Sequence, residues 1–177
     1  MSEPDGPDRA KLSAMKLTLH YAIDCPPERF WALYFDRDYT TRLHREALGS
    51  TSVEIVEQHG DATSGIGRTL RYGQRPDAPG PVKRIFGDEI LTTEVSNFDP
   101  ATGTSTFTVT PGTMADKTEI HGSINVEADG DRSRQTFNLE ARVKIFGAGP
   151  VVERFIERQA RDTQDKAVRF MNKELAG

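Results

Sequence analysis

The 177-residue chain has few of the residues that build disulfides and metal centres. Its single cysteine, Cys25, cannot form an internal disulfide, and no signal-like apolar segment stands at the start of the sequence. This cysteine usage is typical of a reducing compartment, so a cytoplasmic location is expected. No metal is expected either, because no close metal-ligand spacing joins any two of the four histidines, which are His20, His44, His59 and His121.

Long apolar runs and clusters of positive charge are also missing. No apolar stretch approaches the roughly 20 residues that a membrane-spanning helix requires. The net charge is -4, whereas nucleic-acid surfaces normally show clustered lysine and arginine. We therefore expect no nucleic-acid partner.

The pattern of apolar residues predicts a single α+β domain from Met15 to Gly177. Residues 1–14 are rich in Pro, Asp, Gly and Ser, which predicts a disordered tail. From Met15 to Ile23 apolar and polar residues alternate, as in a half-buried strand. Two short helices are expected next, the first capped by Asp24 or Cys25 and the second ending near Leu48.

Strands joined by turns are predicted from Ser50 to about Val143. Asp129-Gly130 is a strong hairpin signal. The proline-rich run 75–81 reads as a loop, and 82–86 as a helical turn or a short bent segment. The expected strands, which with the first make about seven, are 52–58, 67–73, 89–98, 104–110, 117–128 and 133–145.

A long amphipathic helix is predicted from Pro150 to Leu175, because apolar residues recur at three- and four-residue steps. Large side chains mark the two ends of its apolar face, at Phe155 and Phe170. Small or polar residues lie between them, which leaves room against the sheet. These residues are Gln159, Ala160, Thr163 and Ala167.

The turn before this helix, VKIFGAGPVVERF, has the glycines of an anion-binding loop. A dinucleotide or P-loop site would need a third glycine or a Gly-Lys-Ser/Thr, and a parallel sheet. The hairpin turns instead predict an antiparallel sheet. We therefore interpret the two glycines as a hinge, with Pro150 in the first helical turn.

This order of elements resembles the helix-grip fold of the START/Bet v 1-like superfamily, also called SRPBCC or the polyketide cyclase and lipid-transport superfamily. The resemblance covers Met15 to Leu175 and rests on MKLTLHYAIDCPPERFWALYFD, EIHGSINVEADGD and VKIFGAGPVVERFIERQARD. Within the superfamily the chain is most similar to DUF2505, a bacterial family. The resemblance implies a curved sheet around the terminal helix, with a cavity for a lipid, sterol-like molecule, polyketide or aromatic compound.

Three functions are compatible with this resemblance. The first is binding or carriage of a hydrophobic small molecule or lipid without a cofactor. The second is a cyclase- or hydrolase-type enzyme with Tyr21, Tyr72 or His121 as proton donor. The third is a partner-binding module with a filled core. Carriage is favoured over catalysis, because the sequence shows no catalytic constellation and no buried Glu or Arg pair.

Successive residues of a strand point to opposite faces of the sheet, so odd and even positions (their parity) separate inward from outward side chains. This parity and the apolar face of the helix suggest which residues would line such a cavity. In the segment 69–72, apolar parity places Leu70 and Tyr72 inward and Arg71 outward. The segment 75–87 could touch a membrane surface transiently, although a solvated loop anchored by its apolar residues is favoured. The oligomeric state is left open. The candidate ligand-binding residues are Leu19, Tyr21, Leu70, Tyr72, Phe155, Gln159, Thr163 and Phe170.

Overall fold

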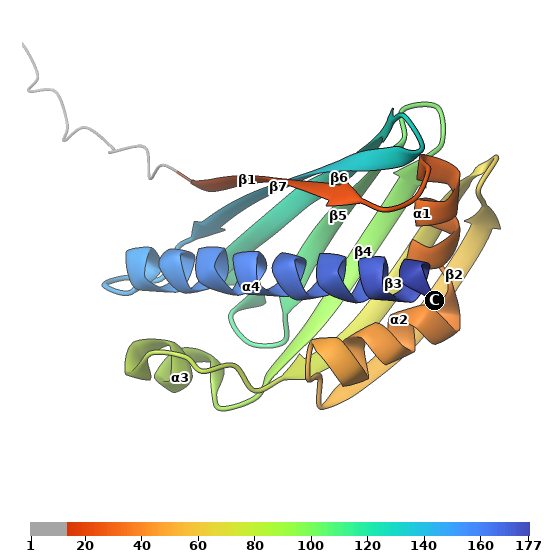
Figure 1. The fold of residues 1–177 in the computed structure, drawn as a ribbon. Helices are drawn as coiled ribbons and strands as arrows, with labels where there is room; N and C mark the ends of the chain where they lie inside the picture. Colours follow the sequence, from red (N-terminus) through yellow and green to blue (C-terminus); the bar gives the residue numbers. More distant parts are fainter. Residues whose placement is uncertain (1–13) are drawn as a thin grey trace, which may run out of the picture.

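The computed structural model describes residues 14–177, so only Ala14 of the predicted disordered tail lies inside the described range. Within this range seven antiparallel strands form one sheet, in the order β1-β7-β6-β5-β4-β3-β2. In Figure 1 the sheet curves around the long terminal helix. The strands are β1 Met15–Ile23, β2 Ser52–Asp61, β3 Gly65–Gln74, β4 Ile90–Asp99, β5 Thr104–Pro111, β6 Thr118–Asp129 and β7 Arg132–Val143.

The helices lie between the first two strands, between β3 and β4, and at the end of the described chain. Helix α2 is capped as its sequence suggests, with the Asp36 carboxylate accepting a 2.7 Å hydrogen bond from the Tyr39 backbone N–H. The helices are α1 Pro27–Tyr34, α2 Arg37–Arg42, α3 Gly80–Phe86 and α4 Gly149–Ala176, and shorter turns span Leu43–Ala47 (η1) and Ala115–Lys117 (η2).

The start of α1 differs from the prediction. The N-cap position is Pro26, and no side chain caps it. Its extended backbone places its carbonyl 3.1 Å from the Phe30 backbone N–H, which begins the helix. The prediction that Asp24 or Cys25 caps this helix is therefore wrong. Asp24 instead forms an ion pair with Arg132.

Several strand boundaries also differ from the predicted ones. The segment 59–65, predicted as a turn, is largely strand, because β2 continues to Asp61 and β3 begins at Gly65. A side chain cannot fit at the end of this hairpin, since a Cβ on Gly60 would lie 2.0 Å from the Gly65 carbonyl oxygen. Between Ile55 and Glu57 the pairing of β2 with β3 shifts at a bulge, which fits the bending of an edge strand.

The core has two parts, one under each end of α4. The larger part contains an aromatic group at the α1 end, in which Trp31 lies 4.4 Å from Phe98 between ring centroids. In the smaller part, α3 buries Val82 and Phe86 against the first turns of α4. The exposed side chains of α3 include Lys83 and Arg84. The segment 75–87 therefore contains a packed helix, where a loop and at most one helical turn were expected.

The C-terminal half of α4 is fixed to the rest of the fold by polar contacts. The Asn172 side chain accepts a hydrogen bond from the Asp24 N–H and donates one to the Ala22 carbonyl. Glu174 receives two parallel bonds of 2.8 Å from the Arg42 guanidinium. No helix among residues 14–177 is long and apolar enough to cross a lipid bilayer.

The glycine turn before α4 is a tight turn that requires both of its glycines. Gly147 has a φ of 72°, a conformation that favours glycine. A Cβ on Gly149 would lie 2.9 Å from the Val143 carbonyl oxygen, so the chain can pass this close to the end of β7 only without a side chain. Pro150 lies in the first turn of the helix, as expected.

Candidate functional site

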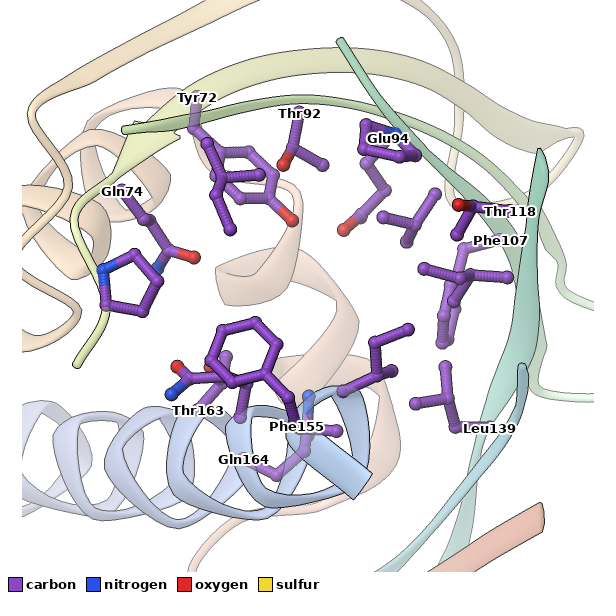
Figure 2. Close-up of a pocket in the computed structure, with 18 of the residues that line it drawn as sticks. Tyr72, Gln74, Thr92, Glu94, Phe107, Thr118, Leu139, Phe155, Thr163 and Gln164 are labelled. Atoms are coloured by element: carbon purple, nitrogen blue, oxygen red, sulfur yellow. The ribbon is translucent and has the colours of Figure 1, made fainter. Parts of the chain in front are cut away.

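A cavity lies between the concave face of the sheet and the first half of α4 (Figure 2). Its volume is about 210 Å³, and a single water requires only roughly 10–15 Å³ on the same measure. The space is therefore larger than a packing defect. Its apolar wall is formed by Phe86, Ile90, Phe107, Val109, Ile120, Ile124, Phe137, Leu139, Val152, Phe155, Ile156 and Ala160.

A second, more polar compartment of about 130 Å³ lies beside the first, under α1, α2 and η1. It reaches the buried groups Arg68, His44 and Gln135. The two compartments have seven lining residues in common, so they are adjacent. The shared wall consists of Tyr34, Tyr72, Gln74, Glu94, Ile124, Thr163 and Gln164.

The register of the sheet explains why polar groups collect at this wall. Facing residues of paired antiparallel strands project to the same side. Leu70 faces Glu94, and Tyr72 faces Thr92, across the β3–β4 pair. Arg68 lies two residues before Leu70 on the same face, opposite Ser96. The inward-facing residues of β3 therefore supply the Arg68 cation and the Tyr72 phenol, and those of β4 supply the Glu94 carboxyl.

Arg68 is the most deeply enclosed charge of this site, with 4% of its surface exposed. Its Nη1 donates hydrogen bonds to the Tyr34 carbonyl at 2.9 Å and to the Thr40 hydroxyl at 3.1 Å. The guanidinium also lies over the rings of Tyr34 and Phe35, at 5.0 and 4.9 Å from their centroids. All of these partners are neutral.

Burial shifts the acidic groups of the wall toward their protonated forms. Burial raises the pKa of the Glu94 carboxyl, and the nearby Arg68 cation lowers it only in part. Burial and the Glu94 charge together raise the pKa of Tyr34 to about 12 and raise that of Tyr72 as well. In Figure 2 the Tyr72 hydroxyl and the Glu94 carboxyl point into the cavity toward one another. The wall thus offers hydrogen-bond donors and acceptors inside an apolar space.

His44 completes the polar compartment. Its ring lies 4.8 Å from that of Tyr72 between centroids, and its Nδ1 is 2.9 Å from the Ser50 hydroxyl. Burial lowers the pKa of His44 to about 4, and the Arg68 cation adds to this effect. The ring is therefore neutral at physiological pH, which leaves Arg68 as the cation of the compartment.

Five of the eight candidate ligand-binding residues lie at these compartments. Phe155 and Gln159 line the larger one, Leu70 lines the smaller one, and Tyr72 and Thr163 line both. The other three, Leu19, Tyr21 and Phe170, pack against the core outside both compartments.

The side chains of Tyr21 and Phe170 have structural partners. The Tyr21 hydroxyl donates a 2.7 Å hydrogen bond to the Asp165 carboxylate on α4. Phe170 packs on Tyr39, with ring centroids 5.6 Å apart.

His121, a candidate proton donor, is exposed in a shallow depression outside both compartments. Of the three candidate proton donors, Tyr72 alone lines the cavity.

We expect Tyr21→Phe to destabilise the fold without changing ligand affinity. The substitution removes one hydrogen bond to a carboxylate, so urea unfolding should show a loss of about 1–2 kcal/mol. A drop in ligand affinity at unchanged stability would contradict this structural role. That result would place the Tyr21 hydroxyl at the ligand.

Sequence reasoning missed Arg68 and Glu94. Arg68 is buried and Glu94 faces into the cavity, but no hydrogen bond or ion pair joins them among the described residues, so the two are not a pair of the kind considered from the sequence. One signal was available for Arg68, which shares strand parity with Ile66, Leu70 and Tyr72. The signal for Glu94 is weaker, because the inward positions nearest to it, Thr92 and Ser96, are polar, and the apolar Ile90 and Phe98 lie four residues away on either side.

A comparison with family models identifies the family of the chain. Residues 18–175 match the model described as "Protein of unknown function (DUF2505)". The chain belongs to the DUF2505 family. This match spans β1 to α4, so the family assignment covers both compartments. No curated protein matches this DUF2505 chain at a significant level.

Solved structures share the fold of this DUF2505 chain at low sequence identity. The ZhuI aromatase/cyclase from Streptomyces sp. R1128 has a TM-score of 0.67 and 12% identity, over 92% of this chain and 96% of that one. The values for Ara h 8.0201 are 0.66 and 14%, over 93% and 100%. A START superfamily protein from Mycobacterium smegmatis gives 0.59 and 12%, over 92% and 97%. The predicted START/Bet v 1-like helix-grip fold is thereby confirmed.

No group of three or more His, Cys, Asp or Glu side chains within residues 14–177 is arranged to hold a metal ion. The sole cysteine, Cys25, is buried, and burial raises the pKa of its thiol. A raised pKa disfavours the nucleophilic thiolate. The polar side chains that line the two compartments carry hydroxyl, carboxyl, amide, imidazole and guanidinium groups.

Proposed function

We propose that this DUF2505 protein binds a hydrophobic small molecule in the cavity between its sheet and α4. The observation that carries the proposal is the combination of volume and lining. A space of about 210 Å³, bounded mainly by aliphatic and aromatic side chains, lies beside the packed core. Such a space, with a few polar groups at one side, is the usual form of a small-molecule site.

The composition of α4 supports this proposal. Its middle presents Gln159, Ala160 and Thr163 to the cavity, where larger apolar residues would fill the space. The ends of the helix are packed, at Phe155 near α3 and at Met171 in the larger core. The sequence therefore keeps the space open at one place while stabilising the helix on either side of it.

Native mass spectrometry tests the proposal. Protein purified from its own cells is measured under native conditions and then extracted with organic solvent, and the extract is analysed. We expect a bound species that is released by the solvent and partitions into the organic phase. Reproducible absence of any bound mass, together with no thermal shift across a panel of lipids and aromatic compounds, would contradict the proposal.

A second candidate function is an enzyme that uses the same cavity. It is favoured by one observation, the convergence of the Tyr72 hydroxyl and the Glu94 carboxyl inside the cavity (Figure 2). Burial raises the pKa of both groups, as is common for general acids. A protein of the same fold, ZhuI, is an aromatase/cyclase by name.

Incubation of the purified protein with an organic extract of its own cells separates the two functions. Carriage leaves the mass and retention time of every extracted compound unchanged. Catalysis converts a compound with the wild-type protein, and Glu94→Gln and Tyr72→Phe slow the conversion. Unchanged compounds in all three samples would argue against the enzyme.

A further inference from the structure

The guanidinium of Arg68 has donors that the protein leaves unused. Both of its hydrogen bonds to described residues start from Nη1. The Nη2 atom makes no hydrogen bond to a described residue, and Nε is buried behind it without one. An arginine carries five N–H donors in a planar fork that matches a carboxylate. This fork lines the polar compartment, which adjoins the apolar cavity.

The charge of Arg68 also has no anionic partner in contact with it among residues 14–177. The groups that it contacts are a backbone carbonyl, a hydroxyl and two aromatic rings, all of which are neutral. His44, on the other side of the compartment, is a neutral ring at physiological pH. Glu94 interacts with Arg68 through space only, and burial favours the uncharged form of its carboxyl. A buried cation without an anionic partner is costly to maintain, and a ligand could supply the missing charge.

We propose that the ligand of this cavity is an amphipathic acid, whose carboxylate binds Arg68 in the polar compartment while its apolar body fills the larger cavity. This inference rests on the proposed function and adds the chemical class of the ligand. The two compartments are adjacent and share lining residues, so an acid of this kind lies along their common wall. The Tyr72 hydroxyl and the Glu94 carboxyl, in its protonated form, are hydrogen-bond donors for the second carboxylate oxygen.

A monoanion fits this compartment better than a phosphate monoester does. Arg68 supplies one positive charge, whereas a phosphate carries nearly two negative charges at neutral pH. A dianion would also repel any ionised fraction of Glu94 at the shared wall. The carboxylate is therefore the head group that the charges of the site match.

The test compares three twelve-carbon ligands that differ only in the head group: dodecanoate, dodecan-1-ol and monododecyl phosphate. Their dissociation constants are measured at neutral pH by displacement of the neutral fluorophore N-phenyl-1-naphthylamine. We expect the wild-type protein to bind dodecanoate about tenfold or more tightly than dodecan-1-ol, the effect of one charge-assisted pair. Equal affinities would overturn the inference, and tighter binding of the phosphate would overturn the carboxylate assignment.

Three variants assign the effect to Arg68. We expect Arg68→Met to weaken dodecanoate binding by about 10- to 100-fold and to change dodecan-1-ol binding by less than about threefold. Arg71→Met, the same substitution at an exposed position of β3, is the matched control, and we expect it to bind both ligands as the wild type does. Glu94→Gln keeps a hydrogen-bond donor and removes the ionisable carboxyl, so we expect it to retain the preference for the acid. If Glu94 is the counterion of Arg68, the preference will instead be absent from the wild type and present in Glu94→Gln, which overturns the inference.

The outcomes for the inference and for the proposed function are distinguishable. Binding of the fluorophore and the alcohol without any advantage for the acid overturns the inference alone. Failure of the fluorophore and of all three ligands to bind overturns both. The wild-type comparison needs no variant, so it decides even where Arg68→Met does not fold.

Discussion

Thr163→Trp is expected to abolish binding of the neutral fluorophore N-phenyl-1-naphthylamine. Thr163 lies on α4 in the shared wall and lines both compartments, so a large side chain there occupies the space that a ligand would enter. We expect the dissociation constant to rise by about 100-fold or more, equivalent to about 2.8 kcal/mol of binding free energy. The fold should be retained, because the new side chain enters existing space.

The matched control for Thr163→Trp is Arg169→Trp, which adds the same side chain on the exposed side of α4. This control should bind the fluorophore as the wild type does. Urea unfolding of Thr163→Trp then distinguishes a tryptophan that fills an empty cavity from one that overpacks a solid core. If Thr163→Trp lost about 1–3 kcal/mol of stability or failed to fold, the site would be a packed core, and the partner-binding module with a filled core would be favoured.

The elements of the fold were predictable because their signals are local. In β1 the predicted inward residues Leu17 and Ile23 are buried, and the alternate positions Lys16 and His20 are exposed. The hairpin at Asp129-Gly130 joins β6 and β7 as expected, with Asp129 paired to Arg132. Strand alternation and turn signals depend only on residues a few positions apart, so they can be recognised in a single sequence.

The polar groups of the site were harder to predict, because strand parity assumes that the inner face is apolar. Strand β4 breaks this assumption. Leu91 and Val95 lie on its outer face with 58% and 44% of their surface exposed, while Glu94 and Ser96 face inward. Ile90 and Phe98 lie on the inner face of the same strand, so its apolar residues are divided between the two faces and do not identify the inner one. The strand lies over a cavity, where inward-facing polar residues meet open space.

Parity also fails to separate cavity residues from packed ones. Tyr21 faces inward as predicted, but it meets Asp165, past the middle of α4. Leu70 faces inward from β3 and lines the polar compartment. Both residues satisfy the same sequence rule. Which one lines free space depends on where α4 crosses the sheet, and a contact between residues 144 positions apart leaves no local sequence signal.

The fold is expected to lose about 3 kcal/mol of stability between pH 6.5 and pH 4 because of one buried histidine. Burial lowers the pKa of His44 from its ordinary 6.5 to about 4. Between these values the unfolded chain binds a proton at His44 and the folded chain does not. The free energy of unfolding therefore falls as the pH falls through this range, by about 1.4 kcal/mol for each unit of difference between the two pKa values.

Urea unfolding at a series of pH values, with two histidine variants, isolates this effect from the titration of carboxylates. His44→Gln removes the group, so the difference in stability between this variant and the wild type should shrink steadily from pH 7 to pH 4. His121→Gln, at an exposed position in β6, should follow the wild type throughout. Parallel curves for His44→Gln and the wild type would show that the ring accepts its proton in the folded state. In that case the His44 ring would be a cation beside Arg68 below its ordinary pKa of 6.5, and at such pH the compartment would hold two positive charges.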